Sequence, residues 1–378
     1  MPRFLKRLLG AAVIALVLVA INMAMSREGF FGVGVPLYQV DLWKMAGINI
    51  ILAVSLNLIN GFTGQFSIGH IGFMAVGAYS SAYLTVYYTQ GWEQSLAGMV
   101  GAQAAAAIIF TFVILVGALA AALAGLLVGI PTLRLRGDYL AIATLGFAEI
   151  IRILIVNIDK VGAATGFRGA IAPHVGRETI PAYTNFLWIG VFVVITIVII
   201  YNIVNSDTGR ALVSIREDEL AAQAMGVNTT RYKVTAFVIS AAFAGVAGAL
   251  YGHWRLPHPA DFTFTRSFEI IIMIVLGGMG SITGAVLGAL VITFLPELLR
   301  QLPGGVYDYR LVIYAALLIL IMIVRPQGML GGREFGFNWL KRAQRRPEGD
   351  EAVGASRGIP IAERDDPTTD RAKEVENR

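Results

Sequence analysis

The sequence contains no cysteine among its 378 residues, and only 15% of the residues are charged. The absence of cysteine excludes disulfides, thiol catalysis and cysteine-ligated metal. A charged fraction well below the roughly 25% of soluble domains argues against an ordinary soluble protein. Hydrophobic residues make up 56% of the chain, and the mean hydropathy is +0.68. Several almost uncharged runs of about 18 residues or more therefore predict an all-α, polytopic membrane protein.

Motifs for energy conversion and hydrolysis are also missing. No G-x-x-x-x-G-K-[ST] sequence occurs, so the chain has no P-loop of its own for ATP. No H-E-x-x-H or G-x-S-x-G motif occurs either, and the four histidines are too scattered to suggest a metal site. We therefore expect no enzyme activity, no catalytic residue, no metal and no cofactor in this chain. The net charge of +5 does not indicate nucleic-acid binding, because Lys and Arg follow the loops of a membrane protein.

The apolar runs, separated by polar loops, predict about ten membrane segments. Residues 1–25 have the basic start and apolar core of a signal peptide, but no clean cleavage site follows, which favours an uncleaved first span. The run 96–130 is too long for one untilted span, so it either tilts and protrudes or breaks near Gly117. The expected segments are 1–25, 43–59, 66–88, 96–130, 139–158, 185–204, 232–252, 268–278, 281–299 and 310–324.

Lys and Arg gather in four places: the N-terminus, the loop 131–138, the polar segment 205–233 and the C-terminal tail. The positive-inside rule places all four on the cytoplasmic side. The tail returns to that side only if residues 268–299 cross as two short pieces joined by a tight glycine turn. We therefore expect both termini to be cytoplasmic. Residues 1–332 would form a transmembrane domain, and 333–378 a hydrophilic tail whose composition predicts disorder.

The polar segment 205–233 stands between two long apolar runs. Its periodicity predicts one short amphipathic helix, Arg210–Gly226, with Gly226 ending it as a C-cap would. One side of this helix is predicted to carry Leu212, Ile215, Leu220, Ala224 and Met225. A capped helix outside the hydrocarbon, between two spans, indicates that another protein docks there.

Two glycine-interrupted stretches, 57–65 and 276–284, lie in opposite halves of the chain. They are either ordinary turns or a weak sign of internal repeats around a transport path. Ionisable residues inside spans are further candidates, because burying charge in lipid is costly. His70 fits an interfacial hydrogen bond or a path-lining role, and Glu149 either neutralises Arg152 three residues later or lines the path. The candidates for path or helix breaks are Asn57, Gly61, Gly64, Gln65, His70, Glu149, Gly277, Gly278 and Gly280.

Four motifs in order resemble one family. They are SLNLINGFTGQFSIGHIGFMAVGAY at 55–79, RLRGDYLAIATLGFAEIIRI at 134–153, IREDELAAQAMGVNTTRYK with AFVISAAFAGVAGALYG at 215–252, and VLGGMGSITGAVLGA at 275–289. The series is similar to LivM-type permeases of branched-chain amino acid ABC importers, over roughly residues 40 to 330. The resemblance implies a type II ABC importer permease fold in the bacterial inner (plasma) membrane.

The same resemblance implies partners. These would be a LivH-type permease, two cytoplasmic ATPase subunits that bind the ATP, and a periplasmic amino-acid-binding protein. The segment 205–233 then resembles the coupling loop, in which Leu220-Ala221-Ala222 and Gly226 are similar to an E-A-A-x3-G pattern, with Glu219 one place early. The residues implied to face the ATPase are Arg216, Glu217, Asp218, Glu219, Ala221, Ala222 and Gly226.

The cargo follows from the resemblance only as a class. Branched-chain amino acids are the family's usual cargo, while similar permeases import urea, short amides or other amino acids. Two further alternatives are a proton- or ion-coupled secondary carrier and a multi-span scaffold without transport. The spans contain no chain of acidic residues of the kind expected of a proton-driven carrier, which favours the ABC permease.

Overall fold

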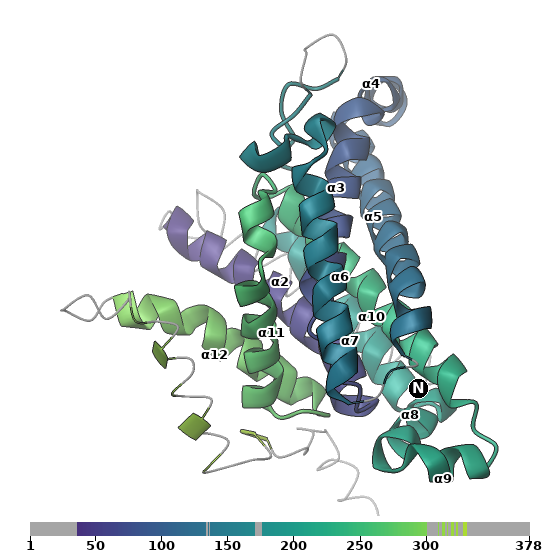
Figure 1. The fold of residues 1–378 in the computed structure, drawn as a ribbon. Helices are drawn as coiled ribbons and strands as arrows, with labels where there is room; N and C mark the ends of the chain where they lie inside the picture. Colours follow the sequence, from purple (N-terminus) through teal and green to yellow (C-terminus); the bar gives the residue numbers. More distant parts are fainter. Residues whose placement is uncertain are drawn as a thin grey trace, which may run out of the picture. The chain divides into compact units, whose positions relative to one another are not determined.

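The computed structural model describes residues 36–133, 135, 137–170 and 176–300, and a few positions between 309 and 330. The expectations for residues 1–25, Arg134, Arg136, most of 310–324 and the tail 333–378 lie outside this described part. Within it, every regular element is helical, as the sequence predicts (Figure 1).

Five described helices are long and apolar enough to cross a membrane: α2 with its continuation η1 (Leu37–Phe62), α5 (Ala102–Thr132), α6 (Asp138–Val156), α7 (Phe186–Val204) and α10 (Thr229–Gly252). The shorter helices α3 (His70–Tyr87), α11 (Phe264–Gly277) and α12 (Ile282–Arg300) pack among them. Short 3-10 turns occupy Asp159–Val161, Ala163–Thr165 and Pro259–Phe262. The helices coincide with the predicted apolar segments to within a few residues at most ends.

Two of these spans form the centre of the fold. The most apolar windows of α2 and α10 are 78% and 72% buried, whereas those of α5, α6 and α7 are 22–33% buried. Helix α10 reaches the centre through small residues: a Cβ on Gly248 would lie 2.0 Å from the Met74 carbonyl of α3, and one on Gly77 would lie 2.3 Å from the Gly245 carbonyl. Backbone contact of this kind lets helices associate where no hydrophobic effect drives packing.

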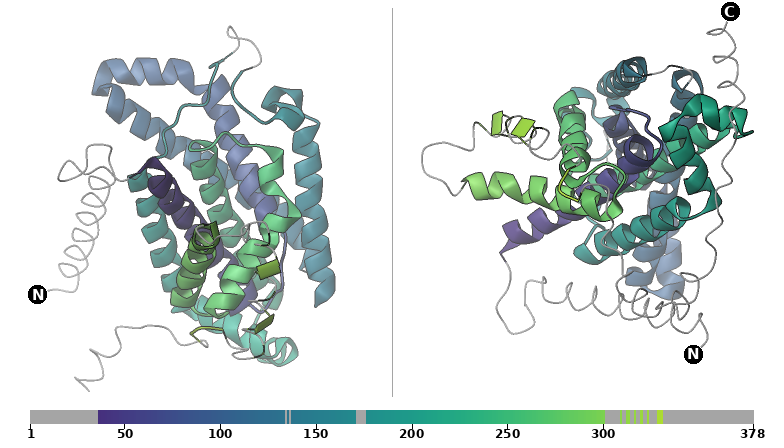
Figure 2. Two further views of the ribbon diagram at one scale, coloured as in Figure 1. Left: turned by 90° about the vertical axis from the view of Figure 1, so that its left-hand side faces the viewer. Right: turned by 90° about the horizontal axis from the view of Figure 1, so that it is seen from below.

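The long run 96–130 is interrupted at its start and is one continuous helix from Ala102 onward, so of the two expected alternatives the break near Gly117 does not occur. The chain bends at Gly101, which has φ +87 and separates α4 (Thr89–Val100) from the continuous α5. The expected break near Gly117 is wrong. Gly117 lies within α5 and packs against the Gly77 carbonyl, so its lack of a side chain allows close helix packing and does not bend the helix. Figure 2 shows α4 turning away from the end of α5.

The predicted division of 268–299 is confirmed. Helix α11 ends at Gly277 and α12 begins at Ile282. Gly278 and Gly280, at φ +112 and +81, make the turn between them in a backbone region that side chains disfavour.

The single helix expected at Arg210–Gly226 is wrong. The segment forms two helices, α8 (Asp207–Glu217) and α9 (Glu219–Ala224), because Asp218 is extended and caps α9. The Asp218 carboxylate accepts hydrogen bonds from the Leu220 and Ala221 N–H groups at 2.8 and 3.0 Å. The predicted end is confirmed: Gly226 has φ +86, and its N–H and that of Val227 bond the Gln223 and Ala222 carbonyls, which is a Schellman motif.

Candidate functional site

The two glycine-interrupted stretches meet through the side chain of Asn57. Its Oδ1 accepts a hydrogen bond from the Gly280 N–H at 2.9 Å, and its Nδ2 donates to the Ser281 carbonyl at 3.0 Å. Asn57 is fully buried. One amide therefore joins α2 to the turn between α11 and α12. We refer to Asn57, Gly61, Arg216, Gly280 and Ser281 as the junction.

The junction requires glycine at position 61. A Cβ there would lie 2.1 Å from the Asn57 Oδ1 and 2.4 Å from the Gly280 nitrogen. Gly64, at φ +71, is similarly confined, because its Cβ would lie 2.7 Å from the Arg216 Cγ. The glycines at these places allow three segments of backbone to approach one another closely.

Helix α2 does not stop at Asn57 but continues as η1, a π-helical turn at Leu58–Phe62. A π-turn disturbs the regular backbone ladder, so carbonyl groups in it need other donors. The Gly61 carbonyl accepts a hydrogen bond from the Arg216 Nη1 at 3.1 Å, and the Leu58 carbonyl accepts one from the Thr63 hydroxyl at 2.8 Å. Arg216 thus connects α8 directly to the break in α2.

The guanidinium of Arg216 is oriented by its neighbour. Its Nη2 and Nε donate to Glu217 Oε1 at 2.6 and 3.2 Å. This pair is partly exposed, so it contributes little to stability by itself. Its effect is to direct the remaining donor, Nη1, toward Gly61.

Apolar and charged contacts fix α8 and α9 to the membrane helices. Leu212 of α8 is fully buried in a small cluster with Leu58 of η1 and Ala236 of α10. Lys233 near the start of α10 is only 4% exposed and binds Glu219 of α9 at 2.6 Å. Glu219, which lies one place early in the expected pattern and was predicted to face the ATPase, is therefore the partner of a buried lysine.

The outer side of α9 is apolar and exposed. Leu220 and Met225 are 62% and 85% exposed, while Ala222 is buried. The prediction that Leu220 and Met225 share a side with Leu212 and Ile215 is wrong, because the break at Asp218 changes the direction of the chain. Two exposed apolar side chains on an amphipathic surface helix form a possible contact for a partner.

Not every predicted candidate lies at the junction. His70 begins α3 and is buried, with its Nε2 2.9 Å from the Ser55 hydroxyl of α2. Gln65 is half-buried and contributes its backbone N–H to the Ile59 carbonyl. Glu149 lies on α6 and pairs with Arg152, whose Nε is 2.9 and 3.0 Å from the two carboxylate oxygens. Gly277 lies one residue before the turn, where its backbone contacts that of Gly284.

Sequence reasoning did not single out Lys233 or Ser281 as site residues. Lys233 was part of the polar segment, but only the fold shows that it is buried. Ser281 contributes a backbone carbonyl, for which no side-chain pattern gives a signal.

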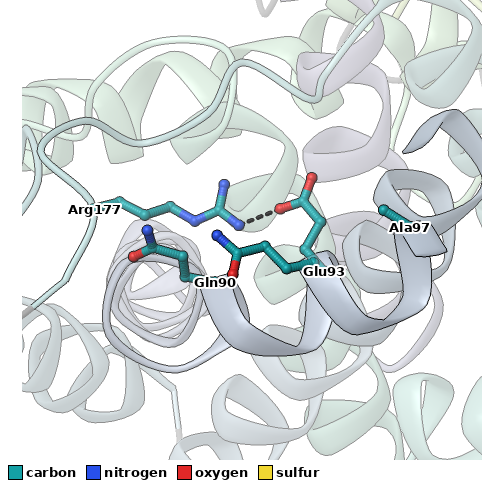
Figure 3. A pocket seen from close by; sticks show the side chains of 5 residues that line it. Gln90, Glu93, Ala97 and Arg177 are labelled. Atoms are coloured by element: carbon teal, nitrogen blue, oxygen red, sulfur yellow. Dashed lines mark hydrogen bonds and ion pairs between the residues drawn. The ribbon is translucent and has the colours of Figure 1, made fainter. Parts of the chain in front are cut away.

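A second polar cluster lies on α4, at the opposite end of the helices from α8 and α9 (Figure 1). Figure 3 shows Arg177 reaching Glu93. Together with Gln90, Gln94 and Ala97, these two residues line a pocket of about 340 Å³. The Tyr183 hydroxyl donates to the same carboxylate at 2.7 Å. Burial favours a raised pKa for Glu93, but the hydrogen bonds from Arg177 and Tyr183 outweigh it and hold this pKa below 4.5.

This cluster gives a pH-dependent prediction. A carboxylate with a lowered pKa stabilises the fold above its unfolded pKa of 4.5, and this contribution is lost as the pH falls through the folded value. We expect Glu93→Gln to melt several °C below the wild type at pH 7, and the difference to close below pH 4.5. The exposed Glu178→Gln serves as a control without such a difference. A difference in melting temperature between Glu93→Gln and the wild type that stays constant between pH 7 and 4 would contradict this account.

Comparison with known proteins places the chain in a family. The LivM permease protein of the high-affinity branched-chain amino acid transport system of Salmonella typhimurium is 36% identical, over 77% of this chain and 70% of the relative. The Escherichia coli LivM protein is 35% identical, over 77% and 69%. A protein named as a probable LivM permease from Methanocaldococcus jannaschii is 24% identical, over 77% and 94%. No solved structure gives a significant match.

Residues 39–322 match the family described as the branched-chain amino acid transport system / permease component. This range begins in the first turn of α2, includes every later helix up to α12, and contains all five residues of the junction. The helices long enough to cross a membrane fit the same conclusion. The chain is a multi-pass membrane protein and belongs to the family of branched-chain amino acid transport permease components.

Proposed function

We propose that this chain is the permease subunit of an ATP-driven importer of branched-chain amino acids. The observation that carries the proposal is the pair of helices α8 and α9, which exposes Leu220 and Met225 while Arg216 reaches the break in α2. The family and the names of the relatives support the cargo. Because the sequence has no P-loop, separate ATPase subunits would bind the ATP, and this chain would need no cofactor.

The partners and orientation are part of the same proposal. The Lys and Arg residues at 205–233 favour a cytoplasmic position for α8 and α9, with both termini on that side. The complex would contain a LivH-type permease, two ATPase subunits and an external amino-acid-binding protein. One ATPase subunit would bind α8 and α9 of this chain, and the other would bind the corresponding segment of the LivH-type permease. The transporter would lie in the inner membrane of a bacterium. The α4 end, with the Glu93–Arg177 cluster, would then face the external binding protein.

The contacts provide a route for coupling. Movement of an ATPase would shift α9 and, through the Glu219–Lys233 bond, the start of α10. Movement of α8 would act on the Gly61 carbonyl through Arg216. The hydrogen bond from Gly280 to Asn57 would then transmit this movement to the turn between α11 and α12. Packed helices of this kind move as rigid bodies, so a small shift at the surface can change the relation of the two halves.

The docking surface is tested by a charge at Met225. We expect Met225→Glu to reduce the amount of ATPase subunit that co-purifies with the permease at least tenfold, because a carboxylate would be desolvated in an apolar groove. Met99→Glu is a matched control, since Met99 on α4 is 82% exposed and Met225 is 85% exposed.

The readout is the ratio of ATPase to permease in the purified complex, with uptake measured in parallel. Full ATPase recovery and full uptake in Met225→Glu would count against docking on α9. Uptake by the permease chain alone, abolished by an ionophore, would instead favour the secondary carrier.

A further inference from the structure

Helix α6 differs from the other described spans in where its charges lie. In α2 and α10 every charged side chain lies within the first eight residues of the helix, and α5 and α7 have none. In α6, Glu149 and Arg152 are the twelfth and fifteenth of 19 residues. At 1.5 Å per residue, Glu149 lies about 3 Å past the middle of the helix. Glu149 therefore lies near the middle of the apolar helix, and Arg152 lies about 7.5 Å past the middle.

This pair faces away from the core. The Glu149 and Arg152 side chains are 41% and 29% exposed, and Ile142, seven residues before Glu149 and so on the same side of the helix, is 66% exposed. Leu140 and Ala148 are on the buried side of α6, where Ala148 meets Gly72 of α3. Helix α6 lies at the periphery of the described helices (Figure 2). The chain itself therefore does not bury the pair.

Lipid is an unfavourable neighbour for this face. A charged side chain at the centre of a membrane helix costs about 2.5–3.5 kcal/mol on insertion scales, and such residues normally face a protein interior or a water-filled cavity. The exposed face of α7 is apolar, as a lipid face requires, with Ile195, Val198 and Ile199 exposed, and the exposed Ile142 and Ile153 of α6 are apolar as well. The Glu149–Arg152 pair, rather than the whole exposed face of α6, thus fits an aqueous path in the assembled transporter.

We propose that Glu149 and Arg152 form a transient binding site for the zwitterionic backbone of an amino acid in transit. This inference rests on the proposed function. The α-carboxylate would bind the Arg152 guanidinium, whose planar fork matches a carboxylate, and the α-ammonium would bind Glu149. In the structure the two side chains satisfy each other through the Arg152 Nε at 2.9 and 3.0 Å from the carboxylate oxygens.

The exchange is balanced in charge. One ion pair opens, and two charge-assisted contacts with the ligand replace it, so the path gains no net charge. The site would recognise the backbone shared by all α-amino acids and leave the side chain to a binding protein. Conduction through a membrane requires binding sites weak enough to release the solute, and competition from the internal pair provides such weakening.

The test uses the double variant Glu149→Gln with Arg152→Gln in the full reconstituted transporter. No unpaired charge remains in it, so a role limited to neutralising the helix predicts normal uptake. We expect uptake of labelled leucine to fall more than tenfold, with ATP hydrolysis and subunit composition within about twofold of the wild type. The control is Asp41→Asn with Lys44→Gln, which removes an i,i+3 pair from the first eight residues of α2, away from the proposed ATPase contact.

Each outcome decides the proposal. Uptake in the double variant within twofold of the wild type would overturn it, and so would loss of a subunit, because the pair would then be an assembly contact. A wild-type complex that takes up no branched-chain amino acid would count against the proposed function instead. The two failures are therefore distinguishable.

Discussion

Asn57→Leu should strongly destabilise the permease. Leucine is close to asparagine in size, but it cannot accept from the Gly280 N–H or donate to the Ser281 carbonyl. A buried donor left without a partner costs about 1–3 kcal/mol, and a lost hydrogen bond about 0.5–1.5 kcal/mol. The sum, about 1.5–4.5 kcal/mol, is a large part of the 5–15 kcal/mol typical of a folded domain.

The measurement is thermal unfolding of the purified protein, together with the yield of monodisperse material. Asn205→Leu is the matched control, because the exposed Asn205 amide bonds only the Tyr201 carbonyl of its own helix, at 2.7 Å. A melting temperature for Asn57→Leu equal to that of the control would show that this amide does not hold the two halves together.

Arg216→Met should separate ATP hydrolysis from uptake. Methionine keeps the apolar stem of the side chain but removes the donor to the Gly61 carbonyl. A hydrogen bond from a charged group contributes about 1.5–3 kcal/mol, which corresponds to a factor of roughly 10–100. We expect uptake per ATP hydrolysed to fall by about that factor, with hydrolysis itself within about twofold of the wild type.

Arg210→Met is the control for this experiment. Arg210 lies on the same helix and pairs with Asp207, but its side chain is 74% exposed. Equal uptake per ATP in Arg216→Met and Arg210→Met would mean that the packing of Leu212 on Leu58 transmits the movement without the hydrogen bond. In both variants the buried face of α8 is unchanged, so loss of the ATPase from the complex is not expected.

Features that depend on neighbouring residues could be predicted from the sequence. The apolar runs 139–158 and 185–204 place α6 and α7 within two residues at each end. The glycine turn between α11 and α12 was predicted from the count of crossings, and its positive φ angles explain why glycine is there. The glycine at 226 likewise ends α9 as its local pattern indicates.

Features that depend on contacts between distant residues could not be predicted from the sequence. Asn57 and Gly280 are 223 positions apart, and no local periodicity shows that they bond. The break at Asp218 has a local cause, because aspartate is a preferred N-cap, but helical spacing continued through it and concealed the cap. Gly101 and Gly117 look alike in sequence; only the packing of Gly117 against α3 distinguishes a bend from a contact.

The π-turn η1 also constrains the length of the chain. Such a turn closes over five residues where an α-turn closes over four, so it contains one residue more than a regular helix needs. Deleting one of the residues between Asn57 and Gly61 would restore regular spacing, but it would change the direction of the Asn57 side chain relative to the backbone of residue 61 and shorten the distance along the helix between them. The amide could then no longer face Gly280 while the backbone of residue 61 faces Arg216. We therefore expect an insertion or deletion in this segment to disrupt the junction as a side chain at position 61 would.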